Sequence, residues 1–266
     1  MQRVRSWRMP PDYLTDSACH NALASTLTND LKANWSSATT KALGWEALKA
    51  VMRGACMSST YGVRRQLEAT LGSKEHRLAV LQGSGVTSQE VRQELLQVRT
   101  SDGDLVTNHQ DVLEVFVELL CGVYSARAVG TLGQIEEYLD GLGLPRLPPG
   151  LLQELACEIH MEELGVAIQA LSRSKVPDAD GFPAKFYQVY SVSLRGKLLE
   201  VLCEARDIGI LPRTMREHII CLLPKPGRDA TDPSSYRPLT MLSTDIKILS
   251  KVLASRLSTV VHTLVH

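Results

Sequence analysis

Apolar side chains recur every third or fourth residue through most of this chain, the spacing that gives a helix one face toward a core. Leucines at every fourth position predict a first helix over 23–31. A second helix is expected within Trp45–Arg53, with an inward face made of Leu48, Val51 and Met52. A third is expected from about Tyr61 to Gln82, with a stripe of Val63, Leu67, Leu71, Leu78 and Leu81.

The most regular apolar stripe follows a polar turn. Ser101–Asp104 (SDGD) carries two carboxylates around a glycine. They suit a metal site or a tight turn between two strands, and the Asp-Gly preference of hairpins favours the turn. Residues 107–110 (TNHQ) predict a capped helix start. The helix after them repeats apolar residues at i, i+3, i+4, i+7, i+8 and i+11, namely Val112, Val115, Phe116, Leu119, Leu120 and Val123.

Glycine and proline mark a connector at 141–150 (GLGLPRLPPG), and helices resume after it. One or two are expected within Leu151–Leu171, with an inward face of Leu164, Ala167, Ile168 and Leu171. Pro177–Gly181 is predicted to be a loop in which Asp178 and Asp180 are turn and capping residues rather than metal ligands. A long helix follows and stops at Gly209, with a buried face of Leu194, Leu198, Val201, Leu202 and Ala205.

A last helix is expected from Ser243 or Thr244 onward. Its predicted inward face consists of Ile246, Leu249, Leu253, Leu257, Val260 and Val261. Three cations lie off that face: Lys247, Lys251 and Arg256. They suit contacts with a nucleic-acid backbone, or they serve only to keep the helix in solution.

Between the last two helices, the pattern changes to that of a hairpin. The apolar runs Ile219–Leu223 and Leu239–Leu242 predict two strands, within an antiparallel hairpin around 217–242. The intervening loop, rich in proline and small polar residues, is typical of an ordered turn. Lys225, Arg228 and Arg237 then project from a rigid frame, which suits a triphosphate or a nucleic-acid backbone. The alternative is a solvated loop with ordinary surface charges.

Charge and cysteine content add little to this pattern. Residues 1–82 hold 11 basic and 6 acidic side chains, 83–170 hold 4 and 14, and 171–266 hold 14 and 9. Two basic blocks thus flank an acidic one, which is compatible with nucleic-acid contacts at the ends. The six cysteines are scattered without a C-x-x-C pair, so they are expected to be reduced and structural. Such cysteines indicate an intracellular protein, expected in the nucleus or cytoplasm. No apolar run approaches membrane-spanning length, so no membrane partner is expected.

Four motifs in order carry a resemblance to a known family. Residues 219–257 (IICLLPKPGRDATDPSSYRPLTMLSTDIKILSKVLASRL) resemble the fingers of reverse transcriptases from non-LTR (LINE-type) retrotransposons, whose pattern runs LIPKxGKD, YRPISLL and KILAKVLANRL. Residues 172–188 (SRSKVPDADGFPAKFYQ) are similar to the family's KSPGPDGFPAEFYK segment. Residues 7–14, 34–40 and 45–71 resemble, less specifically, the linker between endonuclease and reverse transcriptase. The resemblance implies that Lys225 and Arg237 hold the phosphates of the incoming nucleotide.

Phosphoryl transfer by two metal ions needs carboxylates that hold both ions. In the family these lie in the palm, downstream of the helix that ends in ANRL. Beyond Arg237 the only acidic residue here is Asp245, which is expected to cap a helix. We therefore expect a chain truncated before the palm, with no catalytic residues, no metal site and no bound cofactor. Mg²⁺ is expected only for the complete enzyme.

These observations predict a mainly α (α+β) fold with a helical linker followed by partial fingers and one small antiparallel hairpin. The expected segments are a helical linker over 1–100, a helix and connector over 101–150, and partial fingers over 151–266. Three hypotheses remain open: an inactive fragment of a reverse transcriptase, a helical module that binds nucleic acid, and a non-functional remnant. The expected partners are RNA or an RNA–DNA hybrid and dNTP, with self-association through an exposed apolar face.

Overall fold

The computed structural model describes residues 7–9, 11–58, 97–125, 130–143, 145–173 and 180–264. They form two compact units, each built from separate stretches of sequence. Unit 1 takes its described residues from Met1–Lys74, Pro145–Ile219 and Met241–His266. Unit 2 takes them from Glu75–Leu144 and Ile220–Thr240. Contacts therefore group the chain differently from the contiguous segments 1–100, 101–150 and 151–266.

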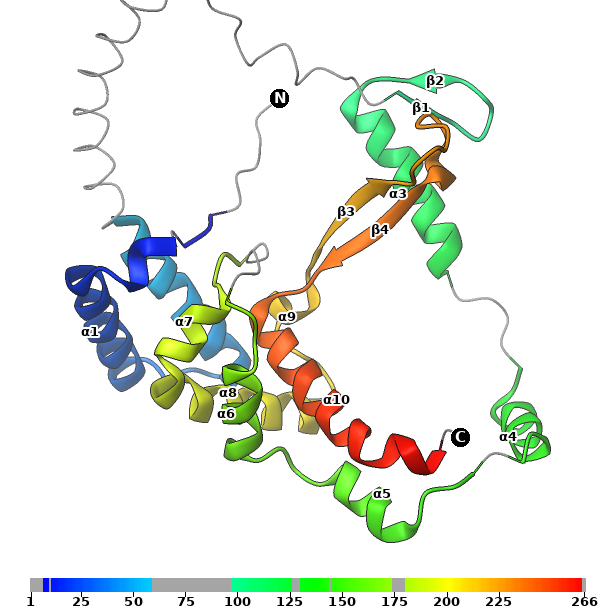
Figure 1. The fold of residues 1–266 in the computed structure, drawn as a ribbon. Coiled ribbons are helices and arrows are strands. Elements are labelled where there is room, and N and C mark those ends of the chain that lie inside the picture. Colours follow the sequence, from blue (N-terminus) through cyan, green and yellow to red (C-terminus); the bar gives the residue numbers. More distant parts are fainter. Residues whose placement is uncertain are drawn as a thin grey trace, which may run out of the picture. The chain divides into compact units, whose positions relative to one another are not determined.

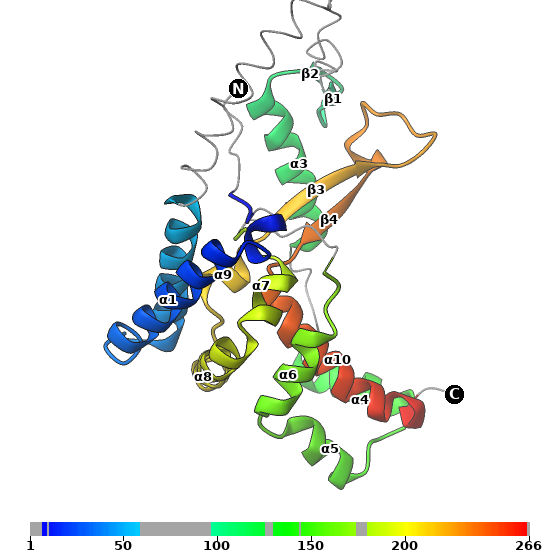
Figure 2. The ribbon, with the colours of Figure 1, turned by 60° about the vertical axis from the view of Figure 1, so that its left-hand side comes forward.

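Unit 1 is helical. Its elements in order are η1 (Pro11–Leu14), α1 (Ser17–Ala33), a helix over 41–58, α5 (Pro149–Ala156), α6 (Met161–Gln169), α7 (Ala184–Val189), α8 (Ser191–Ile208), α9 (Arg213–Arg216) and α10 (Thr244–Leu264). In both views α10 runs beside α6, and α6 also packs on α8 (Figures 1 and 2). Asp16 caps α1 by accepting a hydrogen bond from the Cys19 amide. The expected mainly α fold is confirmed.

Most of the helix faces predicted for unit 1 are confirmed. The five α8 residues expected to be buried are buried, and Gly209 ends that helix in the left-handed conformation with a φ of 78°. In α6, Leu164, Ala167 and Ile168 are buried. The core joins them to buried residues of the first helices, including Leu23, Leu27, Trp45, Leu48 and Met52. The helix expected at Tyr61–Gln82 and the residue Asp178 lie outside the described residues.

Two predicted faces are wrong in part. Val51 is 39% exposed, because the buried face of the 41–58 helix runs through Trp45, Leu48, Lys49, Met52 and Cys56. In α10 the buried residues are Thr244, Asp245, Ile248, Val252 and Val260; Val260 was predicted to face inward, whereas Leu253 and Leu257 of the same predicted face are half exposed. The helix is rotated from the predicted orientation because the carboxylate of Asp245 points into the core.

Unit 2 contains α3 (His109–Tyr124), α4 (Leu132–Gly141) and two small hairpins. Strands β1 (Val98–Arg99) and β2 (Leu105–Val106) pair antiparallel around the predicted Asp-Gly turn, where Gly103 has a φ of 92°. The other hairpin joins β3 (Ile219–Pro224) and β4 (Tyr236–Met241) through η3 (Pro233–Ser235), as the sequence predicted. The described residues thus contain the one hairpin named in the expected fold and a second one at the predicted Asp-Gly turn.

The core of unit 2 is small and lies on α3. Asn108 caps this helix by accepting from the Gln110 amide, which confirms the predicted start. Val112 and Phe116 of α3 are buried with Val98 and Tyr236, and the rings of Phe116 and Tyr236 meet edge-on with centroids 5.1 Å apart. No helix in the described part of the chain combines the length and apolar character needed to cross a membrane.

A glycine substitution tests how tightly unit 1 is packed at the corner before α7. Gly181 has a φ of 81°, and a Cβ there would overlap the carbonyl oxygen of Trp7. We expect Gly181→Ala to lower the free energy of unfolding by roughly 3 kcal/mol, from left-handed strain and steric overlap together. Gly209→Ala is the control, because Gly209 has a similar φ and open space around it. It should cost about 1 kcal/mol.

Urea denaturation followed by tryptophan fluorescence measures both changes, since all three tryptophans belong to the Met1–Lys74 part of unit 1. Equal losses for the two variants would contradict the close contact between Gly181 and Trp7.

Candidate nucleic-acid interface

The β3–β4 hairpin carries three of the predicted phosphate-binding cations. The amide of Lys225 donates to the Ser235 carbonyl at 2.8 Å, so the two strands stay joined beyond the end of β3. Arg237 lies in β4, two residues past the partner of Lys225, and Arg228 lies in the connecting loop. Three cations separated by up to 12 positions in sequence thus belong to one small hairpin (Figure 1).

The loop between the strands is held by its own aspartates. The carboxylate of Asp229 accepts from the amide and hydroxyl of Thr231, both at 2.8 Å. Asp232 accepts from the amide of Ser234 at 2.8 Å and from its hydroxyl at 2.7 Å. These hydrogen bonds hold the pKa of both aspartates below its usual value. The expected ordered loop is confirmed, because short local bonds replace a strand ladder.

The three hairpin cations differ in how free they are. The ammonium of Lys225 donates to the Ser234 carbonyl at 2.7 Å. The guanidinium groups of Arg228 and Arg237 are exposed and make no hydrogen bond or ion pair with any described residue. An anion would find these two arginines available, whereas it would share Lys225 with a carbonyl oxygen. Phosphate binding by Lys225 and Arg237 stays a prediction.

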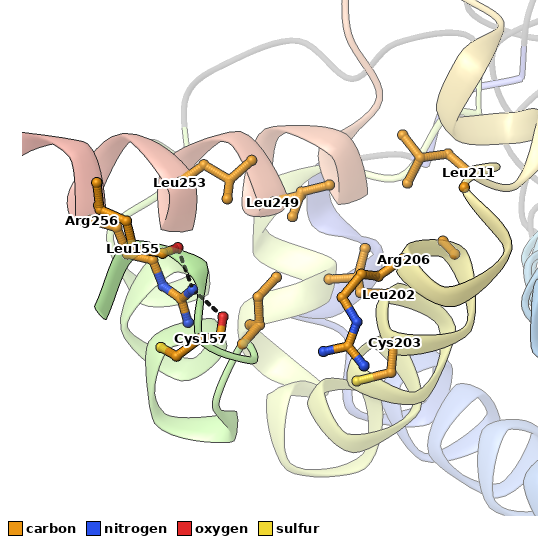
Figure 3. A pocket seen from close by; sticks show the side chains of 12 residues that line it. Leu155, Cys157, Leu202, Cys203, Arg206, Leu211, Leu249, Leu253 and Arg256 are labelled. Atoms are coloured by element: carbon orange, nitrogen blue, oxygen red, sulfur yellow. Dashed lines mark hydrogen bonds between the residues drawn. The ribbon is translucent and has the colours of Figure 1, made fainter. Parts of the chain in front are cut away.

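In unit 1, the three cations of α10 also differ. Lys251 is exposed and Lys247 is half-buried, and neither side chain has a partner among the described residues. Arg256 is held within the protein (Figure 3). Its guanidinium pairs with both carboxylate oxygens of Glu163 at 2.6 Å, and it donates to the carbonyls of Leu155, Cys157 and Glu158. A backbone contact by Arg256 stays a prediction, but the group already fixes α10 to the α5–α6 connection.

A pocket of about 370 Å³ lies beside Arg256 (Figure 3). Its wall is mainly aliphatic, from Leu155, Ile159, Leu202, Leu211, Leu249 and Leu253, and the thiols of Cys157 and Cys203 border it. Arg206 on its rim is paired with Glu158 at 3.0 Å. The residues that line the pocket include no histidine or carboxylate that could activate a thiol. Within the described ranges, no three His, Cys, Asp or Glu side chains gather as they would around a metal ion.

A buried ionic cluster in unit 1 was not predicted from the sequence. The Lys49 ammonium lies 2.8 Å from the carboxylates of both Asp180 and Asp245, and all three side chains are at most 5% exposed. Asp180 does have the predicted turn role, since it accepts from the Phe182 amide. Asp245 was expected only to cap α10. It does accept from the Ile246 amide, but its carboxylate also accepts from the Trp45 indole at 3.0 Å.

The electrostatics of this cluster follow from burial and pairing. Burial opposes the charge on Lys49, but the two carboxylates outweigh it and raise the pKa of Lys49. Burial also opposes the charge on Asp245, yet Lys49, Ser243 and Trp45 hold its pKa below the usual 3.8. For Asp180 burial prevails, and its pKa is raised. The signal in the sequence was a lysine inside an apolar helix stripe, which needs a buried partner.

Comparison with known proteins shows which proteins have a similar sequence. No family model matches the chain. It is 34% identical over 131 residues to the "Transposon TX1 uncharacterized 149 kDa protein" of Xenopus laevis, covering 49% of this chain and 10% of that protein. It is 27% identical over 162 residues to the "Probable RNA-directed DNA polymerase from transposon BS" of Drosophila melanogaster, covering 60% of this chain and 17% of the relative.

A third relative is the "RNA-directed DNA polymerase from mobile element jockey" of Drosophila melanogaster. It is 26% identical over 126 residues, or 47% of this chain and 13% of that protein. The chain is related to the proteins of non-LTR transposons. The resemblance to LINE-type retrotransposon polyproteins is thereby confirmed. The matched segments span between 10% and 17% of these relatives' lengths.

The clamp made by Arg256 gives a test of stability. Lysine has three donors in place of a planar guanidinium, so Arg256→Lys should lower the free energy of unfolding by about 2 kcal/mol. Lys251→Ala is the control on the same helix, where an exposed side chain without a partner should change stability by less than about 0.5 kcal/mol. Urea denaturation measures both, and equal effects would contradict the clamp.

The same clamp predicts a dependence on pH. Hydrogen bonds from Arg256 lower the pKa of Glu163 from 4.5 to about 2. Because the pKa of Glu163 is lowered in the folded state, the stabilisation that its ionised carboxylate contributes is complete above pH 4.5. That stabilisation is lost as the pH falls toward 2. In Glu163→Gln this acid-side loss should be absent. The measurement is the free energy of unfolding against pH for parent and variant, and parallel curves would contradict the assignment.

Proposed function

We propose that this chain contributes the nucleotide-contacting fingers of a retrotransposon RNA-directed DNA polymerase. In this proposal Lys225 and Arg237 hold the phosphates of an incoming dNTP. Arg228, Lys247 and Lys251 contact the backbone of RNA or an RNA–DNA hybrid, and Arg256 would join them only by giving up hydrogen bonds that it makes within unit 1. The observation that supports it most is the hairpin itself, where two exposed arginines without partners among the described residues stand in an ordered loop and strand next to Lys225. Because the loop and strand backbone is already ordered, phosphate binding there requires only the arginine side chains to become ordered.

The proposal assigns binding to these residues and not turnover. Two-metal phosphoryl transfer needs carboxylates open to both ions. Asp245 is the only acidic residue beyond Arg237, and its carboxylate is fully buried against Lys49 and Trp45. The oxygens of this carboxylate are therefore not accessible to Mg²⁺. The 266 residues alone are therefore proposed to bind nucleotide and nucleic acid without polymerising, with Mg²⁺ needed only by the complete enzyme.

Self-association is part of the same proposal. Leu253, Leu257 and Val261 recur at every fourth position of α10 and are 50%, 52% and 42% exposed. A stripe of this kind on a charged helix favours contact with another apolar face. The proposed second face is that of another copy of the chain.

The binding part is tested by removing the free arginines. We expect Arg228→Ala to weaken binding of an RNA–DNA hybrid and Arg237→Ala to weaken binding of dNTP. The slope of log K against log salt should fall by about one for each phosphate that the hairpin no longer neutralises. Arg213→Ala is the matched control, because Arg213 is also exposed but is paired with Glu217. Fluorescence anisotropy over a range of salt concentrations measures each slope. If Arg228→Ala binds the hybrid and Arg237→Ala binds dNTP as tightly as the parent does, the support for a cationic hairpin site is removed.

The catalytic part is tested by primer extension. The purified 266-residue chain, with RNA template, DNA primer, dNTPs and Mg²⁺, should yield no extended primer, because the one carboxylate beyond Arg237 is buried and closed to the metal. A control reaction with a complete reverse transcriptase shows that the template is competent. Any template-dependent product from this chain would overturn the assignment of binding without turnover.

A further inference from the structure

The cluster of Lys49, Asp180 and Asp245 has one ammonium for two carboxylates. Each aspartate places its Oδ2 atom 2.8 Å from the same Nζ. The three residues come from the 41–58 helix, the turn before α7, and the first turn of α10. Asp245 and Lys49 are 196 positions apart, so the cluster joins distant parts of the chain.

No second cation balances the site among the described residues. Arg53 is nearby, but it donates to the backbone carbonyl of Asp180 at 3.0 Å rather than to the carboxylate. The remaining titratable neighbour is Tyr187 of α7, whose buried hydroxyl lies near both aspartates and has no hydrogen-bond partner among the described residues. Asp245 has three hydrogen-bond donors besides Lys49: the indole of Trp45, the hydroxyl of Ser243 and the amide of Ile246. Asp180 has only the Phe182 amide within the described part of the chain.

A buried site with two full negative charges and one positive charge is costly unless a proton neutralises one of them. Asp245 has the better donors, so the proton belongs to Asp180. We propose that Asp180 is a proton-sensitive latch: protonated, it lets the segment 7–58 dock on the rest of unit 1, and ionised, it loosens that docking. The latch is independent of the proposed nucleic-acid binding.

The latch lies where it can act on the segment 7–58. The Met9 amide donates to the Gly181 carbonyl at 3.0 Å, and the rings of Trp7 and Phe182 meet with centroids 5.2 Å apart. On the other side, the Thr244 hydroxyl donates to the Phe182 carbonyl at 2.7 Å. Displacement of residues 180–182 would therefore disturb both the contacts of residues 7–9 and the start of α10.

The direction of the pH effect follows from the two carboxyls. Burial raises the pKa of Asp180 above 3.8, so its contribution is complete below pH 3.8 and is lost as the pH rises through the raised value. The pKa of Asp245 is lowered, so its contribution is complete above pH 3.8 and is lost as the pH falls through the lowered value. Docking is tightest near pH 3.8, and ionisation of Asp180 weakens it on the alkaline side. His20 also meets Tyr190 across this docking surface, so the Asp180 variants below are needed to isolate the contribution of Asp180.

Tryptophan fluorescence reports on this docking directly. All three tryptophans lie in the segment 7–58, and each touches the rest of unit 1. Trp7 meets Phe182, the indole of Trp35 donates to Glu200, and that of Trp45 donates to Asp245. The experiment measures acrylamide quenching of the full chain from about pH 4 to about pH 9, with far-UV circular dichroism recorded alongside.

For the parent, we expect quenching to increase with pH, with a midpoint above 3.8, while the helix signal is retained. Asp180→Asn should remove this increase, because an amide cannot ionise. Asp207→Asn is the control, since Asp207 is an exposed aspartate of α8, and it should behave as the parent does. Asp180→Ser, which keeps an oxygen acceptor for the Phe182 amide, replaces Asp180→Asn if that variant loses its helix signal. A flat profile for the parent, or an unchanged rise in the helical Asp180 variant, would overturn the latch.

Discussion

Unit 1 depends on one buried ammonium. Lys49 lies within an apolar helix face, and a charge in that position is tolerated only when opposite charges and hydrogen bonds surround it. Asp245 supplies the opposite charge, and the carboxyl group of Asp180 lies equally close to the ammonium; both come from sites far away in sequence. The same interaction fixes the rotation of the 41–58 helix, the turn before α7 and the start of α10. Residues that resemble a linker are therefore part of the folded unit that also contains α10.

Other polar contacts across unit 1 follow the same logic. The carboxylate of Glu204 on α8 accepts from the amides of Lys41 and Ala42, both at 2.8 Å, and so caps the 41–58 helix from another element. One turn earlier, Glu200 accepts from the indole of Trp35 at 2.7 Å. Helix ends carry amides without intrahelical partners, and an acidic side chain there also complements the helix dipole. Two glutamates on one helix thus hold the first helices in place.

The parts of this fold that depend on local patterns could be predicted from the sequence. Apolar spacing located α1, α3 and α8, and the Asp-Gly and proline-rich turns located both pairs of strands. The rotation of α10 could not be predicted this way, because Asp245 is polar in the pattern and is buried only through Lys49 and Trp45. The same reason explains the exposure of Val51. Apolar periodicity assigns charged residues to the surface. This assignment is wrong where charged residues pair with one another inside the core.

In the candidate site, the sequence likewise could not show which cations are paired within the protein and which are not. From sequence, Arg237 and Arg256 are both arginines near apolar runs, and nothing local distinguishes them. In the structure every nitrogen of the Arg256 guanidinium donates a hydrogen bond within unit 1, whereas Arg237 has no partner among the described residues. A phosphate that approached Arg256 would have to compensate for broken charge-assisted bonds, each worth about 1.5–3 kcal/mol. At Arg237 it would displace only water.

Lys225 is intermediate between these two cases. Its single bond to the Ser234 carbonyl is a bond to a neutral acceptor, and an ionised phosphate oxygen is a stronger one. Exchange of that carbonyl for a phosphate is therefore favourable on hydrogen-bond strength alone. It also frees the Ser234 carbonyl, which water can satisfy because Ser234 is exposed. On these grounds an anion would bind first at Arg228 and Arg237, and Lys225 would follow once the phosphate was within reach.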